Sequence, residues 1–386
     1  MGQCAPTERT TRRGARAPGA RRAPREKTMR NATAVFACCV MIAVAPATIR
    51  AESSAAELQT LIKEFEKLRG KDRAEGAEII LARIDTLMLK AEKRLEFKEA
   101  ARFARQGASI ARCIKCPRQR DYNLQASEYN RLTGWLGRMK LLAESLKKKP
   151  DKADARRRLI TVYMVRLDNP GAAARFVTDA VEEQLRRIVA LALKSTGELD
   201  ESELLALADW YAKSADVTTL RALLRARAYY KAFLDTTEKR DATYLKARSG
   251  LKSVLKLLDR ALPPVEGKVV PGKDWMATVY VRKGDDLAVT AKGTWTLTFG
   301  RSFRWGRRGT ARIERTFNAD GGDIMGRRFH LVGRIGRGGE EFEIGKSWSG
   351  TADSAGVLFM TISGAPSGNS KGHLAISVRK YPRLPD

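Results

Sequence analysis

The stretch 329–378 restricts the fold of this chain more than any other. It contains short apolar runs at 331–332, 342–344, 357–362 and 374–378, separated by clusters of glycine, serine, aspartate and asparagine. Such runs are typical of short antiparallel strands joined by tight turns, several of which need glycine at positive φ. Three further runs precede them, at 275–281, 286–291 and 294–299. About seven short strands at this spacing predict an all-β, jelly-roll-like sandwich.

Five stretches of the same region form a recognisable set. They read GDDLAVTAKGTW at 284–295, NADGG at 318–322, LVGRIG at 331–336, FEIG at 342–345 and N-x-x-G-x-L-x-I-x-V from Asn369. Together they resemble the PA-I-type galactophilic lectin family, over roughly a third of the chain. The resemblance implies a small β-sandwich with a calcium-dependent sugar site at one end.

The calcium ligands that this resemblance implies are mostly missing. The family holds the ion with an Asn-Asp pair at a strand end and with a later Asp/Asn-Asn pair. Ser363-Gly364 stands at the first position here, and Asn369 followed by Ser370 at the second. Calcium takes about six to eight oxygen ligands, several of them carboxylates, whereas 363–372 contains no carboxylate. We therefore expect no bound metal and no other cofactor.

The segment 299–317, FGRSFRWGRRGTARIERTF, carries six arginines and one acid. It falls between expected strands, just before NADGG, where the family places one wall of its sugar site. Arginine presents a planar fork that suits carboxylate, sulfate or phosphate, and an aromatic ring can stack on a sugar or a base. An anionic glycan, a nucleic acid and a merely solvated basic loop all remain open. The candidate ligand-binding residues are Arg304, Trp305, Arg307, Arg308, Asp320 and Asn369.

Residues 52–262 are expected to form an α-helical domain of antiparallel, repeat-like hairpins. Apolar residues recur there at three- and four-residue spacing, which is the period of a helix with one buried face. The segments 159–174, 203–215 and 223–234 resemble helical-repeat regions of secreted bacterial proteins. Their aromatic residues either line a concave face for a protein partner or pack between helices. Breaks are expected at Gly70, Pro117, Pro150, Asn169-Pro170 and Gly197.

The first 51 residues have the pattern of a leader. Residues 1–28 are basic and without periodicity, which indicates a disordered segment or a mis-assigned start upstream of Met29. Residues 29–51 combine Arg30, an apolar run and small residues before Glu52, as in a secretory signal peptide. A membrane anchor is the alternative, although the run is short for a span. We expect a mature protein without an integral membrane span, located in the periplasm, the cell envelope or outside the cell.

Two cysteines, Cys113 and Cys116, remain after such processing and are spaced C-x-x-C before Pro117. A zinc site would need further ligands, and the only histidines are His330 and His373. In an oxidising compartment this spacing favours a local disulfide. Neither histidine lies near a recognisable serine or cysteine nucleophile, and no phosphate-binding glycine-rich loop precedes a helix. These absences argue against an enzyme.

Pro263-Pro264 forbids continuation of the last helix. We therefore predict a linker at 263–274, a lectin-like sandwich at 275–386, and a multidomain α plus β protein. Two functions fit this organisation. The first is an exported carbohydrate-recognition protein that binds a glycan or another polyanion, consistent with a formal charge of +29, of which +21 lies outside residues 1–51. The second is a structural or scaffolding protein of the cell envelope that binds a protein partner through its helices.

Overall fold

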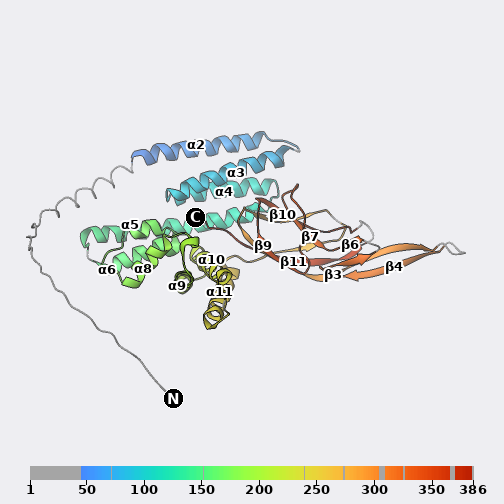
Figure 1. The fold of residues 1–386 in the computed structure, drawn as a ribbon. Coiled ribbons are helices and arrows are strands. Elements are labelled where there is room, and N and C mark those ends of the chain that lie inside the picture. The colour runs from blue at the N-terminus through green and yellow to red at the C-terminus, as the bar shows by residue number, and fades with distance from the viewer. Residues whose placement is uncertain are drawn as a thin grey trace, which may run out of the picture. The chain divides into compact units, whose positions relative to one another are not determined.

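The computed structural model describes residues 45–384, apart from 71, 151, 239, 273, 304–308, 325–326 and 366–369. Helices occupy the first part of the chain and antiparallel sheets the rest (Figure 1), which confirms the predicted mixed α plus β class. The chain divides into two compact units, 1–60 and 61–386. The boundary falls within α2 (Ala45–Lys67). Within the described residues, no helix combines the length and apolarity needed to cross a bilayer.

The helices end close to the predicted breaks because local chemistry stops or starts them there. Gly70, at φ 59°, separates α2 from α3, and Pro117 precedes α5. Asn169 caps α7 by accepting a hydrogen bond from the Ala172 N–H at 2.9 Å, with proline at the next position. After α2 the helices are α3 (Asp72–Lys93), α4 (Phe97–Cys113), α5 (Arg118–Lys148), α6 (Ala153–Thr161), α7 (Pro170–Ala174), α8 (Glu183–Ala192), α9 (Glu201–Ser214), α10 (Leu220–Thr236) and α11 (Ala242–Ala261).

The aromatic residues of the later helices pack between helices. Tyr211 of α9 and Tyr229 of α10 are both buried, and their ring centroids lie 5.9 Å apart. Tyr230 is also buried and donates a hydrogen bond from its hydroxyl to Asp209 Oδ1 at 2.6 Å. Of the two roles that the sequence leaves open for these rings, the structure shows inter-helix packing.

Two antiparallel sheets form the sandwich. One has the order β1–β11–β3–β4, with β9 also paired to β3, and the other has the order β2–β10–β7–β8. Val289, Trp295 and Leu374 of the first sheet share one core with Leu331 and Met360 of the second, so the sheets pack face to face. The strands are β1 (Val265–Val269), β2 (Met276–Val281), β3 (Asp286–Phe303), β4 (Gly309–Phe317), β5 (Gly322–Ile324), β6 (Arg327–Phe329), β7 (Leu331–Ile335), β8 (Phe342–Glu343), β9 (Ser347–Thr351), β10 (Gly356–Ile362) and β11 (Ser370–Tyr381).

Two strand predictions are wrong in detail. The segments 286–291 and 294–299 are one strand, β3, because Gly293 stays in the ladder opposite Leu374 at φ 104° instead of making a turn. The expected linker 263–274 contains β1, whose residues pair with β11 from Val265↔Val378 to Val269↔Leu374. Pro263-Pro264 does end the helix, but the chain joins the sheet directly after it.

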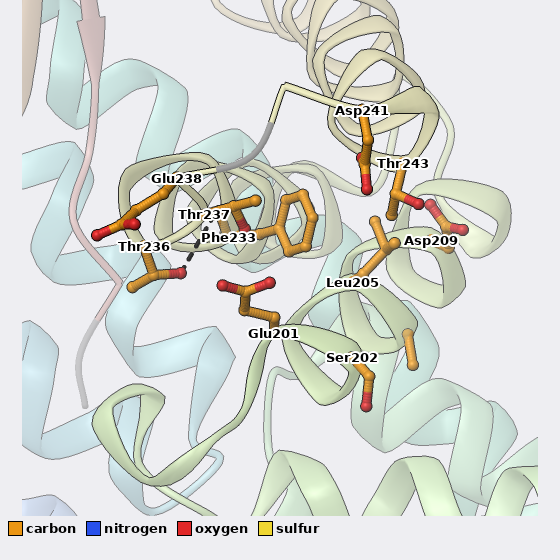
Figure 2. A pocket seen from close by; sticks show the side chains of 11 residues that line it. Glu201, Ser202, Leu205, Asp209, Phe233, Thr236, Thr237, Glu238, Asp241 and Thr243 are labelled. Carbon is orange, nitrogen blue, oxygen red and sulfur yellow. Dashed lines mark hydrogen bonds between the residues drawn. The ribbon is translucent and has the colours of Figure 1, made fainter. Parts of the chain in front are cut away.

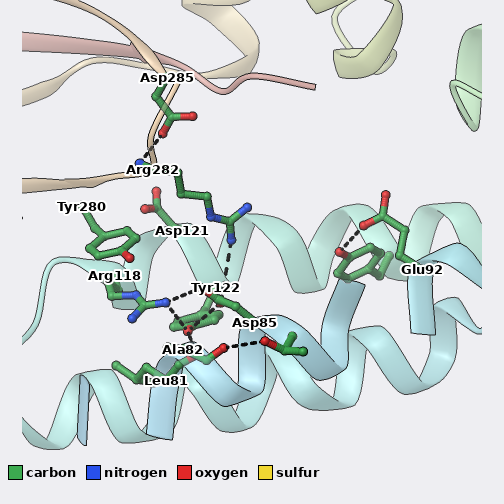
Figure 3. Close-up of polar contacts among 12 residues, drawn as sticks. Leu81, Ala82, Asp85, Glu92, Arg118, Asp121, Tyr122, Tyr280, Arg282 and Asp285 are labelled. Carbon is green, nitrogen blue, oxygen red and sulfur yellow. Dashed lines mark hydrogen bonds and ion pairs between the residues drawn. The ribbon is translucent and has the colours of Figure 1, made fainter. Parts of the chain in front are cut away.

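A buried arginine connects the helices to the sandwich within the second unit (Figure 3). Arg118 of α5 is only 4% exposed, and it donates to Asp85 Oδ2 at 2.5 Å and to the Tyr122 hydroxyl at 2.9 Å. Its guanidinium carbon lies 4.1 Å from the centre of the Tyr280 ring of β2, in cation–π contact. Burial and the Asp85 charge raise the pKa of Tyr122, so its hydroxyl stays protonated.

A second connection joins α10 to the start of β3. The Asp286 carboxylate lies 2.8 Å from Arg227 Nη2 and 3.2 Å from Lys231 Nζ, and it accepts the Thr351 hydroxyl at 2.6 Å. Burial alone would raise the pKa of Asp286. The hydrogen bonds from Thr351 and Arg227 outweigh this effect, so the pKa of Asp286 lies below its usual value.

Replacing Arg118 by methionine should lower the free energy of unfolding by about 3 kcal/mol, because it leaves a partly buried carboxylate and a buried phenol without their donor. The matched control is Arg157→Met, which removes an exposed pair with Asp154 and should cost about 1 kcal/mol or less. Urea unfolding measures both variants. Equal losses would show that the Arg118 cluster does not hold the helices to the sandwich.

Asp286→Asn should remove a pH-dependent part of the stability. A carboxylate with a depressed pKa stabilises the fold above its ordinary pKa of about 4, and this contribution disappears as the pH falls through the folded-state pKa. The stability difference between wild type and Asp286→Asn should therefore be larger at about pH 7 than at about pH 3. Urea unfolding at both pH values tests this, and a pH-independent difference would contradict it.

Candidate functional site

The described parts of the arginine-rich segment, 299–303 and 309–317, are two paired strands, whereas the sequence places the whole segment between strands. β3 continues to Phe303 and pairs with β4 from Trp295↔Phe317 to Phe303↔Gly309. Beyond Leu297, where the pairing with β11 ends, β4 is the partner of β3 among the described strands. β-branched residues support the ladder, as where the Thr296 and Thr316 hydroxyls lie 3.2 Å apart. The hairpin therefore holds the two ends of the connection next to each other.

Most of the predicted ligand-binding residues lie outside the described residues. These are Arg304, Trp305, Arg307 and Arg308, between the paired ends of β3 and β4, and Asn369 before β11. Among the charged residues of the same segment, Glu314 and Arg315 are described, and both are exposed on β4. Glu314 Oε1 accepts a hydrogen bond of 3.4 Å from the Thr298 hydroxyl across the ladder.

Asp320 is described, and its carboxylate is bound within the protein. Its Oδ1 accepts the Lys346 backbone N–H at 2.7 Å, and its Oδ2 lies 2.5 Å from Lys346 Nζ. These hydrogen bonds hold the pKa of Asp320 below its usual value. The carboxylate thus fastens the NADGG turn to the segment between β8 and β9. A ligand at Asp320 would have to share this carboxylate with Lys346.

The NADGG turn and the start of the 363–372 segment both form backbone hydrogen bonds with the dipeptide His330-Leu331. The Leu331 N–H donates to the Ala319 carbonyl at 3.1 Å, and the Ser363 N–H donates to the His330 carbonyl at 2.9 Å. The ring nitrogen Nδ1 of His330 is buried and has no hydrogen-bond partner among the described residues. A buried polar atom without a partner lowers the stability of the fold. His330 Nδ1 is such an atom, and it lies beside both segments.

The described donors at this end do not fit a calcium ion. Ser363 and Gly364 provide only a hydroxyl and backbone groups, and Asp320 is held by Lys346, whereas calcium takes several carboxylate oxygens. Across the described part of the chain, no three His, Cys, Asp or Glu side chains are close enough to hold a metal ion.

Cys113 and Cys116 are free thiols, so the predicted disulfide is not formed in this structure. Cys113 ends α4 and is exposed, while Cys116 lies in the following turn and is partly buried. Burial raises the pKa of the Cys116 thiol. Because the thiolate is the reactive form, this burial disfavours attack by Cys116 on another sulfur.

The helices contain a groove that the sequence analysis did not identify (Figure 2). It has a volume of about 850 Å³ and is lined by α9, α10 and the start of α11. Leu205 and Phe233 form its apolar part, with acidic side chains around them. Two of the carboxylates already have structural partners, because Asp209 bonds Tyr230 and Lys246, and Asp241 caps α11. The signal in the sequence is a set of acids, of which Glu201, Glu238 and Asp241 lie near helix ends and Asp209 lies within α9.

No protein-family profile matches the chain, and no curated protein matches it either. Among solved structures, the chain is similar to one described as "EclA N-terminal domain; PllA-like lectin". The two are 18% identical over 30% of this chain and 95% of that chain, with a TM-score of 0.22. At this level the likeness concerns the fold at most, and no residue role follows from it.

Gly321→Ala should disrupt the NADGG turn. Gly321 has a φ of 71°, and a Cβ there would lie 1.4 Å from the Phe329 carbonyl oxygen, so the backbone must move as well as adopt a left-handed conformation. We expect a loss of about 2 kcal/mol or more in the free energy of unfolding. The control is Gly338→Ala, where a Cβ meets nothing within 4 Å. Similar stability of the two variants in urea would contradict the described turn.

Proposed function

We propose that this protein is an exported, non-enzymatic binding protein that recognises an anionic glycan through the β3–β4 hairpin. The observation that carries the proposal is the last ladder pair, Phe303↔Gly309. Paired residues of an antiparallel ladder have Cα atoms about 5 Å apart. The five residues between them include three arginines and a tryptophan, Arg304, Trp305, Arg307 and Arg308.

The composition of this connection supports an anionic sugar as the ligand. Guanidinium groups pair in a bidentate way with carboxylate or sulfate, and an indole ring offers an apolar face for a sugar ring. The acid nearest in sequence, Glu314, lies on β4. The signal-like segment 29–51 supports export, where glycans are the more available polyanions.

The alternative, an envelope scaffold that binds a protein through its helices, has less support. Of the four aromatic side chains considered for a partner surface, Tyr211, Tyr229 and Tyr230 are buried between helices. Trp210 is partly buried, with its ring centroid 5.0 Å from that of Tyr211. Three of the four rings therefore belong to the helical core.

The triple variant Arg304→Ala/Arg307→Ala/Arg308→Ala should lower the affinity for a sulfated or carboxylated glycan about tenfold or more, equivalent to about 1.4 kcal/mol. Suitable probes are a heparin oligosaccharide and polygalacturonate, measured by calorimetry in about 150 mM salt with and without calcium. The charge-matched control is Lys147→Ala/Lys148→Ala/Lys149→Ala, at the exposed end of α5, which should change the affinity less than about twofold.

Two results would contradict the proposal. Equal losses in the arginine and lysine variants would show that overall charge, and not the hairpin, attracts the glycan. Calcium-dependent binding to neutral galactosides would show that the family's metal-mediated site persists despite the missing carboxylates.

A further inference from the structure

The outer face of α11 carries a row of cations, here called the α11 ridge. Its members follow one another at four-residue spacing, so each lies about one turn, or ~6 Å, further along the helix. The opposite face, with Ala247, Val254 and Leu258, is buried in the helical core. All the ridge residues are exposed: Arg248, Lys252, Lys256 and Arg260.

The side chains of the α11 ridge have no hydrogen bond or ion pair with any residue that the structure describes. Like charges at four-residue spacing destabilise a helix, and no acid separates these cations along the ridge. Asp259, the acid within α11, is taken by Arg379 of β11 at 2.9 Å. Repulsion among the ridge cations therefore lowers the stability of α11, and no ion pair with the described residues offsets it.

Several other exposed cations of the helices have acidic partners. Arg83 pairs with Glu64 at 3.0 Å, and Lys194 pairs with Glu203 at 2.7 Å. Lys246 of α11 pairs with Asp209 at 2.9 Å. Lys147, Lys148 and Lys149, at the end of α5, are also exposed and have no ion pair with the described residues. The α11 ridge differs from them in the regular four-residue spacing of its four cations along one helix.

A small cavity adjoins the N-terminal end of the ridge. It has a volume of about 360 Å³ and is lined by Arg240, Tyr244, Leu245 and Arg248. Two guanidinium groups beside a phenol ring and an exposed leucine, which is 59% accessible, can hold one acidic sugar residue by charge and by its apolar face.

We propose that the α11 ridge and this cavity form a second binding track, separate from the hairpin, for an acidic polysaccharide. Single-stranded nucleic acid is bound by several aromatic rings that stack successive bases, and this track has one, Tyr244. A helix that lies in a membrane surface needs a broad apolar face, and the exposed face has Leu245 as its large apolar residue. A linear chain of carboxylates or sulfates needs only the spaced cations and one ring.

The test compares Lys252→Ala/Lys256→Ala/Arg260→Ala with the control Lys147→Ala/Lys148→Ala/Lys149→Ala in the full chain. The first variant should bind a heparin oligosaccharide about tenfold more weakly in about 150 mM salt, and the control less than about twofold. Alanine favours helix, so α11 is retained, which circular dichroism checks. The reversal Lys252→Glu/Lys256→Glu, with control Lys147→Glu/Lys148→Glu, should weaken binding further.

Equal losses in ridge and control variants would overturn the track. Ridge-dependent binding to polyuridylate or to phosphatidylglycerol vesicles, without binding to heparin or polygalacturonate, would replace the polysaccharide with a nucleic acid or a lipid surface. Loss of all binding in the hairpin variant alone, with an unaffected ridge variant, would overturn the track and leave the proposed function standing. The reverse result would support the track and overturn the hairpin site.

Discussion

The antiparallel ladder between β3 and β11 is the pairing on which the sandwich depends. It runs without a break from Asp286↔Tyr381 to Leu297↔Ser370, and β1, β4 and β9 all attach to one of these two strands. The same strands carry two of the contacts to the helices, because Asp286 binds Arg227 of α10 and Lys380 binds Asp121 of α5. Loss of this ladder would thus remove both one sheet and much of its attachment to the helices.

The positively charged side chains lie in two kinds of environment. Where helices meet each other or the sandwich, arginines bind carboxylates away from the solvent, as buried Arg118 does with Asp85 and partly buried Arg225 does with Asp168 at 2.7 Å. A buried arginine of this kind is stable because carboxylates and aromatic rings replace its water. On the outer face of α11, by contrast, exposed cations lack such partners, and that surface remains suited to an external anion.

Features that depend on local chemistry were predictable from the sequence. Pro263-Pro264 ends the last helix, and Asn169-Pro170 starts α7, because each acts through its own backbone. Features that depend on distant partners were not. Gly293 looks like a turn residue, yet β11 keeps it in a ladder, and the candidate ligand Asp320 is held by Lys346, 26 residues away. The remaining candidate arginines, Trp305 and Asn369 stay predictions, since they lie outside the described residues.

The position of β11 has a consequence for biosynthesis. This strand lies between β1 and β3, and its partners in β1 precede it by more than 100 residues, as for Val265↔Val378. The sheet cannot close while the ribosome is still adding residues 370–381, so β1 and β3 leave the exit tunnel with open edges. Contacts so far apart in sequence also form slowly. In a chain of this design the first sheet of the sandwich therefore stays incomplete until residues 370–381 have been made.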